Sequence, residues 1–565
     1  MNQKLDDLIE QLGNPEPTSR KAAAYGLRDL NALEAWQAAP ALLDLLTQDP
    51  SMEVKRAAAD ALEFMPFLPA EQAGPLLKAG LETGLRQGLE GDAQGWSLCF
   101  CCLKALEVCR DLTATEAVRA LLTAPNQDLR ESAVRMLGLY RLPERVPDLL
   151  KGLEDSEPAV RLAALEALRL IDADERADAS IKALLQLLET DPDESVRANA
   201  AISLGQMPAA RAWAEVLMIR LKHESSDFVR RMLITALGEL RAEAAYDALL
   251  ALLKPETNDE NPASEMFFTT LVALGRLGDR RATPLLIEIL LGSDDSFSGQ
   301  GLCSHAAEAL ELLGDETAVG PLLEILARQQ AAESKSTSVF TAAAEALVRL
   351  EAEACLPYLL TALSMDDDDF DPERRWMAAI FLGDLGLPEA CQALSECLED
   401  ADPQVAIEAA RSLGKIGCSA CLDALIEVLP DRETGVTAAE ALGRLGDQQA
   451  EAPLLEVLAD PDHPGRGEAA LALARLGCES ALEPSRELIN DRSAEVQVLA
   501  ARALVLLAGA SIREIAPDIL LHPNPAVRLA IIEGLKPEAS DPDVWAFLTA
   551  QPQTQVEVSR RLANG

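Results

Sequence analysis

The stretch Ala438–Asp447, AAEALGRLGD, and the stretch Ala452–Pro461, APLLEVLADP, together decide the fold of this chain. In the first, Ala, Leu and Gly recur at intervals of three and four residues, which is the spacing of one face of an α-helix. The second begins near a Pro, which is tolerated in the first turn of a helix, and continues as Leu-Leu-x-x-Leu. We therefore predict two helices that pack against each other.

The same pattern recurs along the chain with a period of 29–44 residues, and the last five steps are 31, 29, 31, 31 and 31 residues long. Anchored on the Leu of Ala-Leu-Gly, the copies number sixteen. The anchors are Leu27, Leu62, Leu106, Leu137, Leu168, Leu204, Leu237, Leu274, Leu310, Leu347, Leu382, Leu413, Leu442, Leu473, Leu504 and Leu535. One such unit cannot bury its apolar faces alone, but stacked units can. We predict an all-α fold, an α-solenoid of about 16 two-helix repeats that forms a curved superhelix.

The ends of the predicted helices carry their own signals. First helices often follow a dipeptide such as Asp191-Pro192 or Asp402-Pro403, in which the Asp can cap free N–H groups. They end at Leu-Gly, where Gly can take the left-handed conformation of a C-cap, as we expect for Gly278, Gly314 and Gly446.

Several first helices begin with Val followed by a basic residue, as in Val160-Arg161 and Val196-Arg197. With the two-helix period, this pattern resembles HEAT repeats, in particular the short type found in phycobilisome lyase-like proteins. The resemblance covers essentially residues 1–560. It implies the solenoid fold strongly and a function only weakly, because the repeat type occurs in scaffolds, lyases and a metal hydroxylase.

Irregular spacing divides the array into four predicted segments. Residues 1–95 contain an insertion near 66–95, residues 96–236 are HEAT-like, residues 237–382 have extended loops between repeats, and residues 383–565 hold regular 31-residue repeats and a C-terminal cap. The extended loops are expected at 255–264, 293–301, 331–338 and 364–372. In a stacked array these loops align on one edge, where they either form a binding rim or vary neutrally.

Composition excludes several function classes. The chain of 565 residues has 93 acidic and 50 basic residues, a formal charge of −43, which disfavours binding to nucleic acids or to anionic membranes. The N-terminal residues lack the pattern of a signal peptide. Eleven cysteines, an odd number in aliphatic surroundings, suit a reducing compartment. We expect a cytoplasmic protein.

The second helices predict a file of acidic side chains at one repeated position. These residues are Asp44, Glu288, Glu324, Glu396, Glu427, Glu456 and Glu487. Their neighbours Leu and Val face the core, so the carboxylates should face solvent. The family resemblance implies that second helices line the concave side. The file then either forms an acidic groove for a cationic partner or only keeps the protein soluble.

A dense acidic run adds Asp366, Asp367, Asp368 and Asp369 as candidate partner contacts. It lacks the Gly and the distal Glu of a calcium loop, so we interpret it as a solvated loop or a contact for a partner's Arg and Lys. The adjacent Arg374, Arg375 and Trp376 combine base and aromatic and are further candidates for partner contact.

No pattern predicts a catalytic site, a cofactor or a metal. Cys418 and Cys421 form a lone C-x-x-C, whereas structural zinc needs a second pair and a redox motif needs a βαβ context. Cys391 and Cys397 lie one unit earlier, but Cys397 fits the core pattern, so we interpret these cysteines as packed small residues. The resemblance includes a metal hydroxylase, deoxyhypusine hydroxylase, which uses several His-Glu dyads. This sequence has one such dyad, His223-Glu224, so we do not predict a di-iron site.

We therefore predict a non-enzymatic scaffold, adaptor or assembly factor that binds a protein partner with a basic surface or tail in an acidic concave groove. Two alternatives stay open. One is a bilin lyase-like protein that handles a chromophore, because such proteins share this repeat. The other is a regulator whose negative charge mimics nucleic acid.

Overall fold

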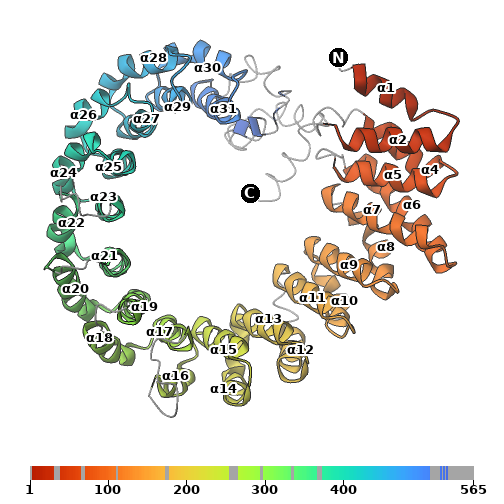
Figure 1. The fold of residues 1–565 in the computed structure, drawn as a ribbon, viewed down its shortest axis with the longest axis horizontal. Coiled ribbons are helices and arrows are strands. Elements are labelled where there is room, and N and C mark those ends of the chain that lie inside the picture. Colours follow the sequence, from red (N-terminus) through yellow and green to blue (C-terminus); the bar gives the residue numbers. More distant parts are fainter. Residues whose placement is uncertain are drawn as a thin grey trace. The chain divides into compact units, whose positions relative to one another are not determined.

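A computed structural model describes residues 3–30, 38–64, 70–109, 112–171, 177–253, 265–292, 297–331, 336–364 and 372–508, and residues 522, 524, 526, 527, 530 and 531. Every regular element in these ranges is an α-helix or a 3-10 helix, which confirms the all-α solenoid (Figure 1). The chain divides into two compact units, Met1–Ala245 and Tyr246–Gly565. The four predicted segments are a finer division and stay a prediction.

The first unit is a row of helix pairs that starts after α1 (Gln3–Gln11). Its first helices are α2 (Pro17–Arg28), α5 (Met52–Glu63), α7 (Ala93–Cys109), α9 (Gln127–Leu139), α11 (Pro158–Leu170), α13 (Glu194–Gly205) and α15 (Asp227–Glu239). Its second helices are α4 (Ala39–Gln48), α6 (Ala70–Leu89), α8 (Thr115–Ala120), α10 (Val146–Gly152), α12 (Ala177–Thr190) and α14 (Ala214–His223). The irregularity expected near residues 66–95 includes α6, which is 20 residues long and packs along α7.

The second unit continues the same alternation. Its first helices are α17 (Glu265–Leu277), α19 (Phe297–Leu313), α21 (Thr337–Arg349), α23 (Pro372–Leu385), α25 (Pro403–Ile416), α27 (Thr434–Leu445), α29 (Arg466–Arg475) and α31 (Ala494–Ala508). Its second helices are α16 (Tyr246–Leu252), α18 (Thr283–Gly292), α20 (Val319–Ala331), α22 (Leu356–Leu363), α24 (Cys391–Glu396), α26 (Leu422–Glu427), α28 (Glu451–Ala459) and α30 (Leu482–Leu488). Short 3-10 turns such as η13 (Ser419–Cys421) lead into the second helices.

The repeat anchors form the core of both units. Fourteen of the sixteen anchor leucines are fully buried. Leu168 is half-buried, and Leu535 lies outside the described residues. Burial of such aliphatic side chains stabilises the fold by about 1.5–3 kcal/mol for each Leu.

Small residues bring successive first helices into close contact. A Cβ atom on Gly414 of α25 would lie 2.8 Å from the Cα of Ala441 in α27, and one on Gly443 would lie 2.7 Å from the Cα of Ala472 in α29. Gly138 meets Ala167 in the first unit in the same way. In each unit the first helices lie on the inner edge of the curved row and the second helices on the outer edge (Figure 1). Close packing along one edge therefore accompanies the bend of the row.

The predicted glycine ends and the Asp402 cap are confirmed, whereas the prediction for Asp191 was wrong: the N-cap of α13 is Asp193, which accepts a hydrogen bond from the N–H of Val196. Gly278, Gly314 and Gly446 have φ angles of 77°, 62° and 73°, and the Asp402 carboxylate accepts a hydrogen bond from the N–H of Gln404. In three repeats the left-handed position holds a side chain instead, with φ of 50° at Arg141, 48° at Arg241 and 52° at Glu351.

Buried and half-buried arginines connect successive first helices. Arg161 of α11 binds the Asp191 carboxylate through two nitrogen–oxygen contacts of 2.7 and 2.8 Å, and its Nη1 donates to the carbonyls of Asp155 and Ser156. Equivalent pairs recur along the chain. They are Arg20–Asp49, Arg130–Asp155, Arg197–Glu224, Arg375–Asp400 and Arg466–Asp491. We call these six pairs the arginine ladder. In the pair Arg161–Asp191 its two members are the basic residue after Val160 and the acid before Pro192.

Three of the predicted loops are shorter than expected. Phe297–Gly301 forms the first turns of α19, Ala331 ends α20, Thr337 and Ser338 begin α21, and Pro372 begins α23. Most of the remaining predicted loop residues lie outside the described residues. Within the described ranges, no helix combines the length and apolarity needed to cross a bilayer.

Candidate functional site

All seven predicted column carboxylates are exposed to solvent, each on a second helix. The second helices, however, lie on the outer edge of each row. The prediction of a concave groove was therefore wrong. The spacing of apolar residues tells which side chains face the core, but it does not tell toward which side the row bends.

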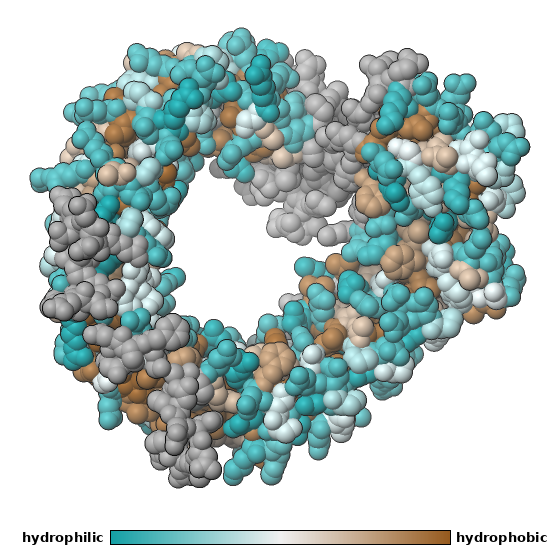
Figure 2. Space-filling view, in the orientation of Figure 1, coloured by the Kyte–Doolittle hydropathy of each residue, from teal (hydrophilic) through white to brown (hydrophobic). Residues whose placement is uncertain are grey.

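The acidic character of this outer edge extends well beyond the column. Four successive segments that contain α24, α26, α28 and α30 are residues 388–399, 419–433, 448–463 and 479–490. They carry fourteen carboxylates and two arginines, Arg432 and Arg486. Thirteen of these carboxylates are exposed, and Glu451 is half-buried. Hydrophilic residues line the outer edge of α26–α30 in Figure 2. We call these four segments the acidic edge.

The inner edge of the same repeats has the opposite balance. The helices α25, α27, α29 and α31 carry four carboxylates and six basic side chains. Some of these groups pair with each other, as Glu440 does with Arg444 at 2.8 Å. Glu468 keeps a raised pKa because of its burial and because Glu495 and Glu440 are near. Negative charge is thus concentrated on one edge of the row.

The other predicted contact residues are corrected by the structure. Arg374 is 1% exposed and lies over the Phe340 ring, 4.3 Å from its centroid, with Nη2 donating to the Gln329 carbonyl at 3.3 Å. Burial lowers the pKa of Arg374 to about 10. Arg375 belongs to the arginine ladder through Asp400, at 3.0 Å, and Trp376 is half-buried.

Arg374 is therefore a core residue and not a partner contact, because its turn of α23 faces α21. The exposed combination of base and aromatic expected at residues 374–376 is lost with it. Asp366, Asp367, Asp368 and Asp369 lie outside the described residues. The His223-Glu224 dyad is also structural in part, since Glu224 is buried in ion pairs with Arg197 and Arg220.

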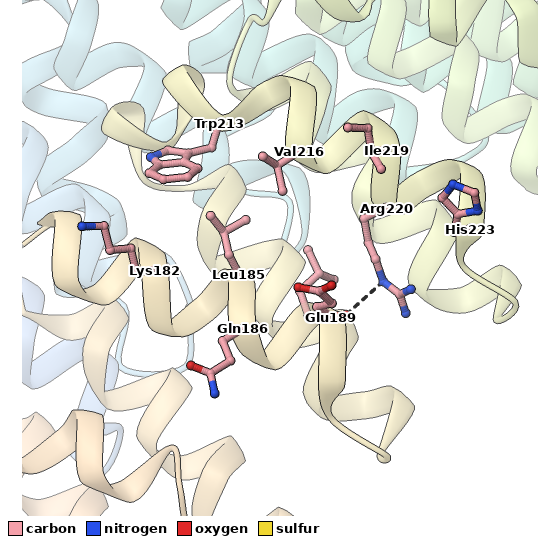
Figure 3. A pocket seen from close by; sticks show the side chains of 10 residues that line it. Lys182, Leu185, Gln186, Glu189, Trp213, Val216, Ile219, Arg220 and His223 are labelled. Atoms are coloured by element: carbon pink, nitrogen blue, oxygen red, sulfur yellow. Dashed lines mark hydrogen bonds between the residues drawn. The ribbon is translucent and has the colours of Figure 1, made fainter.

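An apolar groove that the sequence analysis missed lies between α12 and α14, with a volume of about 580 Å³ (Figure 3). Trp213 and Val216 point toward Leu185 across the groove. Ile219 is 62% exposed and Val216 is 42% exposed. Lys182, Arg220 and His223 are the basic residues that line the groove, and Glu189 is its one acidic residue.

The sequence held a signal for this groove. Each residue of the acidic column stands two residues before a buried apolar residue, as Asp44 does before Leu46. Counted in the same way from the buried Leu188 and Leu221, the equivalent residues are Gln186 and Ile219. An apolar residue at a position that is acidic in other repeats marks the groove.

Three cysteines also meet in the second unit. Cys391 and Cys418 form a disulfide, and the Sγ of Cys421 lies 3.1 Å from the Sγ of Cys418. The structure thus brings together Cys391 and the C-x-x-C pair, while Cys397 is not part of the group.

The comparisons with known proteins agree with this architecture. The family of HEAT repeats matches residues 5–93, 115–180, 181–265, 327–414 and 395–474. The PBS lyase HEAT-like repeat matches residues 270–292. No curated protein matches the chain in sequence.

Among solved structures, yeast importin-beta (Kap95p) is similar, with a TM-score of 0.59 and 12% identity over 98% of this chain and 86% of that chain. Kap121p is similar with a TM-score of 0.45 and 14% identity over 99% of this chain and 76% of that chain. At such identities the first likeness concerns the fold alone. Because the HEAT-repeat matches span more than half of its residues, the chain belongs to the HEAT-repeat family.

Proposed function

We propose that the chain is a non-enzymatic scaffold that binds a protein partner with a basic surface or tail along the acidic edge. The observation that carries the proposal is the separation of charge between the two edges of one row: fourteen carboxylates and two arginines on the outer edge, but four carboxylates and six basic groups on the inner edge. A surface that served solubility alone would need no such separation.

A file of exposed carboxylates has a defined physical effect. Like charges on neighbouring repeats add to a negative potential that extends about one Debye length, ~8 Å at physiological salt. Such a field raises the association rate of a cationic protein and rejects anionic ones. The second helices hold the carboxylates on rigid elements, so that a partner with regularly spaced Lys or Arg meets little ordering cost.

The groove between α12 and α14 supports the same general role through different chemistry. Exposed Ile219 and Val216 beside Trp213 provide apolar area that the acidic edge lacks. Contiguous exposed apolar side chains are typical of protein contact sites.

The decisive experiment compares two triple variants of equal charge change. One variant is E427Q/E456Q/E487Q on the acidic edge. The control is E308Q/E345Q/E495Q, whose three carboxylates are exposed on the first helices α19, α21 and α31. Proteins captured from an extract of the native host by the wild type are identified, and the purified partner is then tested for binding at increasing NaCl concentrations.

We expect a partner with a basic surface, association that slows as salt rises, and a loss of roughly tenfold in association rate for the acidic-edge variant alone. The proposal would be contradicted by a partner with an acidic surface, by binding that does not change with NaCl concentration, or by equal effects of the two variants. Competition by duplex DNA for the partner's binding site would instead indicate nucleic-acid mimicry. Visible absorbance after co-expression with tetrapyrrole synthesis would indicate the lyase-like alternative.

A further inference from the structure

The cysteine cluster, defined as Cys391, Cys418 and Cys421, joins two successive repeats of the second unit. The three Sγ atoms lie within 4.8 Å of one another. Cys391 and Cys421 are buried, while Cys418 is half-buried and is the sulfur nearest to solvent. The cluster therefore lies at the surface end of the contact between the repeats.

The local backbone places the two sulfurs of the C-x-x-C motif on one side of a turn. Cys418 precedes η13, and Cys421 ends it. The N–H of Cys421 donates to the carbonyl of Cys418 at 3.2 Å, which closes the turn. Cys391 is the first residue of α24 in the preceding repeat, and the Cys421 thiol donates to its carbonyl at 3.5 Å.

Three sulfurs in such a group exceed what a disulfide needs. A disulfide uses two cysteines and assigns no part to the third, whereas a soft metal ion uses all three. In tetrahedral zinc sites Zn–S bonds of about 2.3 Å place the sulfurs roughly 3.8 Å apart. Reduction of the Cys391–Cys418 bond frees those two sulfurs to separate to that spacing, and the Sγ of Cys421 lies 3.1 Å from that of Cys418.

We propose that the reduced cluster binds one Zn²⁺ through the thiolates of Cys391, Cys418 and Cys421. Among the described residues no fourth His, Cys, Asp or Glu joins the group. The fourth position of the ion is therefore left for water or an external thiolate. The interpretation of Cys391, Cys418 and Cys421 as packed small residues rested on the absence of a second C-x-x-C pair, but one sulfur from the preceding repeat completes a group of three.

The disulfide and the metal site are alternative states of the same sulfurs. A dithiol reductant supplies two electrons and two protons to the Cys391–Cys418 bond and itself becomes a disulfide. Zn²⁺ then displaces the protons of the three thiols, which pass to solvent. Both states connect α24 to η13, so both staple the two repeats together.

The other cysteines lack this arrangement. Burial raises the pKa of Cys99 and Cys101 to about 12, and at Cys101 the nearby Asp60 contributes to the shift. Such thiols keep their protons at neutral pH. Cys397 lies six residues from Cys391 on the same repeat and outside the cluster. It therefore serves as a matched control.

The test uses the full-length protein, reduced with a dithiol, stripped with a chelator and transferred to oxygen-free buffer. Co²⁺ is added as a spectroscopic probe, and Zn²⁺ is then added to displace it. We expect one equivalent of Co²⁺ to produce sulfur-to-metal charge-transfer bands and the visible bands of a tetrahedral ion, and one equivalent of Zn²⁺ to abolish them.

The variants C391S, C418S and C421S should each weaken binding by more than the ~10–100-fold typical of losing an outer-shell partner. The control variant C397S should bind as the wild type does. Circular dichroism and melting curves of the same samples show whether a variant is folded. Absence of stoichiometric binding to the reduced wild type, or binding retained in folded C418S and C421S, overturns the proposal and leaves a disulfide beside a third cysteine.

Discussion

At the residue scale, the arginine ladder carries much of the contact between repeats. Arg161 is buried and places its guanidinium between the carbonyls of its own turn and the Asp191 carboxylate of the next. The bidentate geometry is one that Lys could not reproduce. Each arginine–carboxylate pair connects a first helix to the turn before the next first helix. The pair therefore fixes both the distance and the register between the two helices.

Removing one partner of a buried arginine–carboxylate pair leaves the charge of the other partner uncompensated. We expect R161A to cost about 3–5 kcal/mol of stability. The exposed control R169A should stay within about 0.5 kcal/mol of the wild type. Hydrogen exchange in α11 and α13 measures the local loss of stability. It is preferred to a global unfolding curve because a repeat array need not unfold in a single two-state transition. Equal exchange in the two variants would contradict the assigned role of the ladder.

Glu468 gives a residue-scale prediction with a defined pH dependence. Burial, together with the charges of Glu495 and Glu440, raises its pKa. A carboxyl group with a raised folded pKa destabilises the protein above that pKa, and the cost disappears below the unfolded value of about 4.3. We expect E468Q to raise the melting temperature by ~1–3 °C at pH 7 and to leave it unchanged near pH 4. A gain of equal size at both pH values would exclude this explanation.

At this scale, sequence patterns predicted which residues matter better than which residues they contact. The dipeptides Val160-Arg161 and Asp191-Pro192 were visible, but their pairing across 30 residues depends on how the repeats stack. The burial of Arg374 was not predictable, because a charged residue beside an acidic run is usually exposed. The third sulfur of the cluster also required three-dimensional stacking.

At the element scale, the glycines of the first helices control the spacing of the repeats. A Cβ atom on Gly443 would lie 2.7 Å from both the Cα and the Cβ of Ala472. In contrast, a Cβ atom on Gly320 of α20 would meet no atom within 4 Å. Replacement of Gly by Ala at residue 320 therefore tests helix propensity alone, whereas the same replacement at residue 443 tests propensity and packing together.

We expect G443A to destabilise the second unit by about 1–3 kcal/mol, because overpacking outweighs the ~1 kcal/mol by which Ala favours a helix. G320A should be neutral or slightly stabilising. Chemical denaturation of both variants tests this difference. If G443A proved as stable as G320A, the close approach would not limit the spacing of the first helices.

The helix ends supply a second prediction at this scale. Glu351 is an exposed residue in the left-handed conformation, with φ of 52°, at the place where other repeats carry Gly. The left-handed conformation costs a residue with a side chain about 1–2 kcal/mol. We expect E351G to stabilise the protein by ~1 kcal/mol and G446A to destabilise it by a similar amount. Denaturant midpoints check both, and a loss for E351G would contradict the assignment.

Helix pairs and their ends could be predicted because apolar periodicity, Asp caps and Gly caps are local signals. The face that a second helix presents to solvent was also predictable. Its place on the outer edge was not, because the bend depends on the relative closeness of first and second helices, as at Gly414 and Ala441. The groove beside Ile219 required a comparison of equivalent positions between repeats.

At the scale of the whole molecule, net charge opposes the folded state. The chain carries −43, and the acidic edge, with fourteen carboxylates and two arginines, contributes −12 of it. Added salt screens the repulsion between these carboxylates. We expect the melting temperature to rise by ~2–5 °C between low salt and about 0.3 M NaCl.

The triple variant E427Q/E456Q/E487Q should respond less to salt than the wild type, whereas the inner-edge control E308Q/E345Q/E495Q should respond as the wild type does. Melting curves at several NaCl concentrations provide the measurement. A melting temperature that falls with salt would mean that attractive ion pairs, and not repulsion along the acidic edge, dominate the electrostatics of the protein.

The position of the carboxylates on the outer edge has a mechanical consequence. Repulsion between neighbouring second helices is relieved when they spread apart, which tightens the bend about the closely packed first helices. Counterions or a polycation that bridges these helices would draw them together and relax the bend. The curvature of this row of repeats should therefore decrease as ionic strength rises, while the glycine contacts between the first helices stay closed.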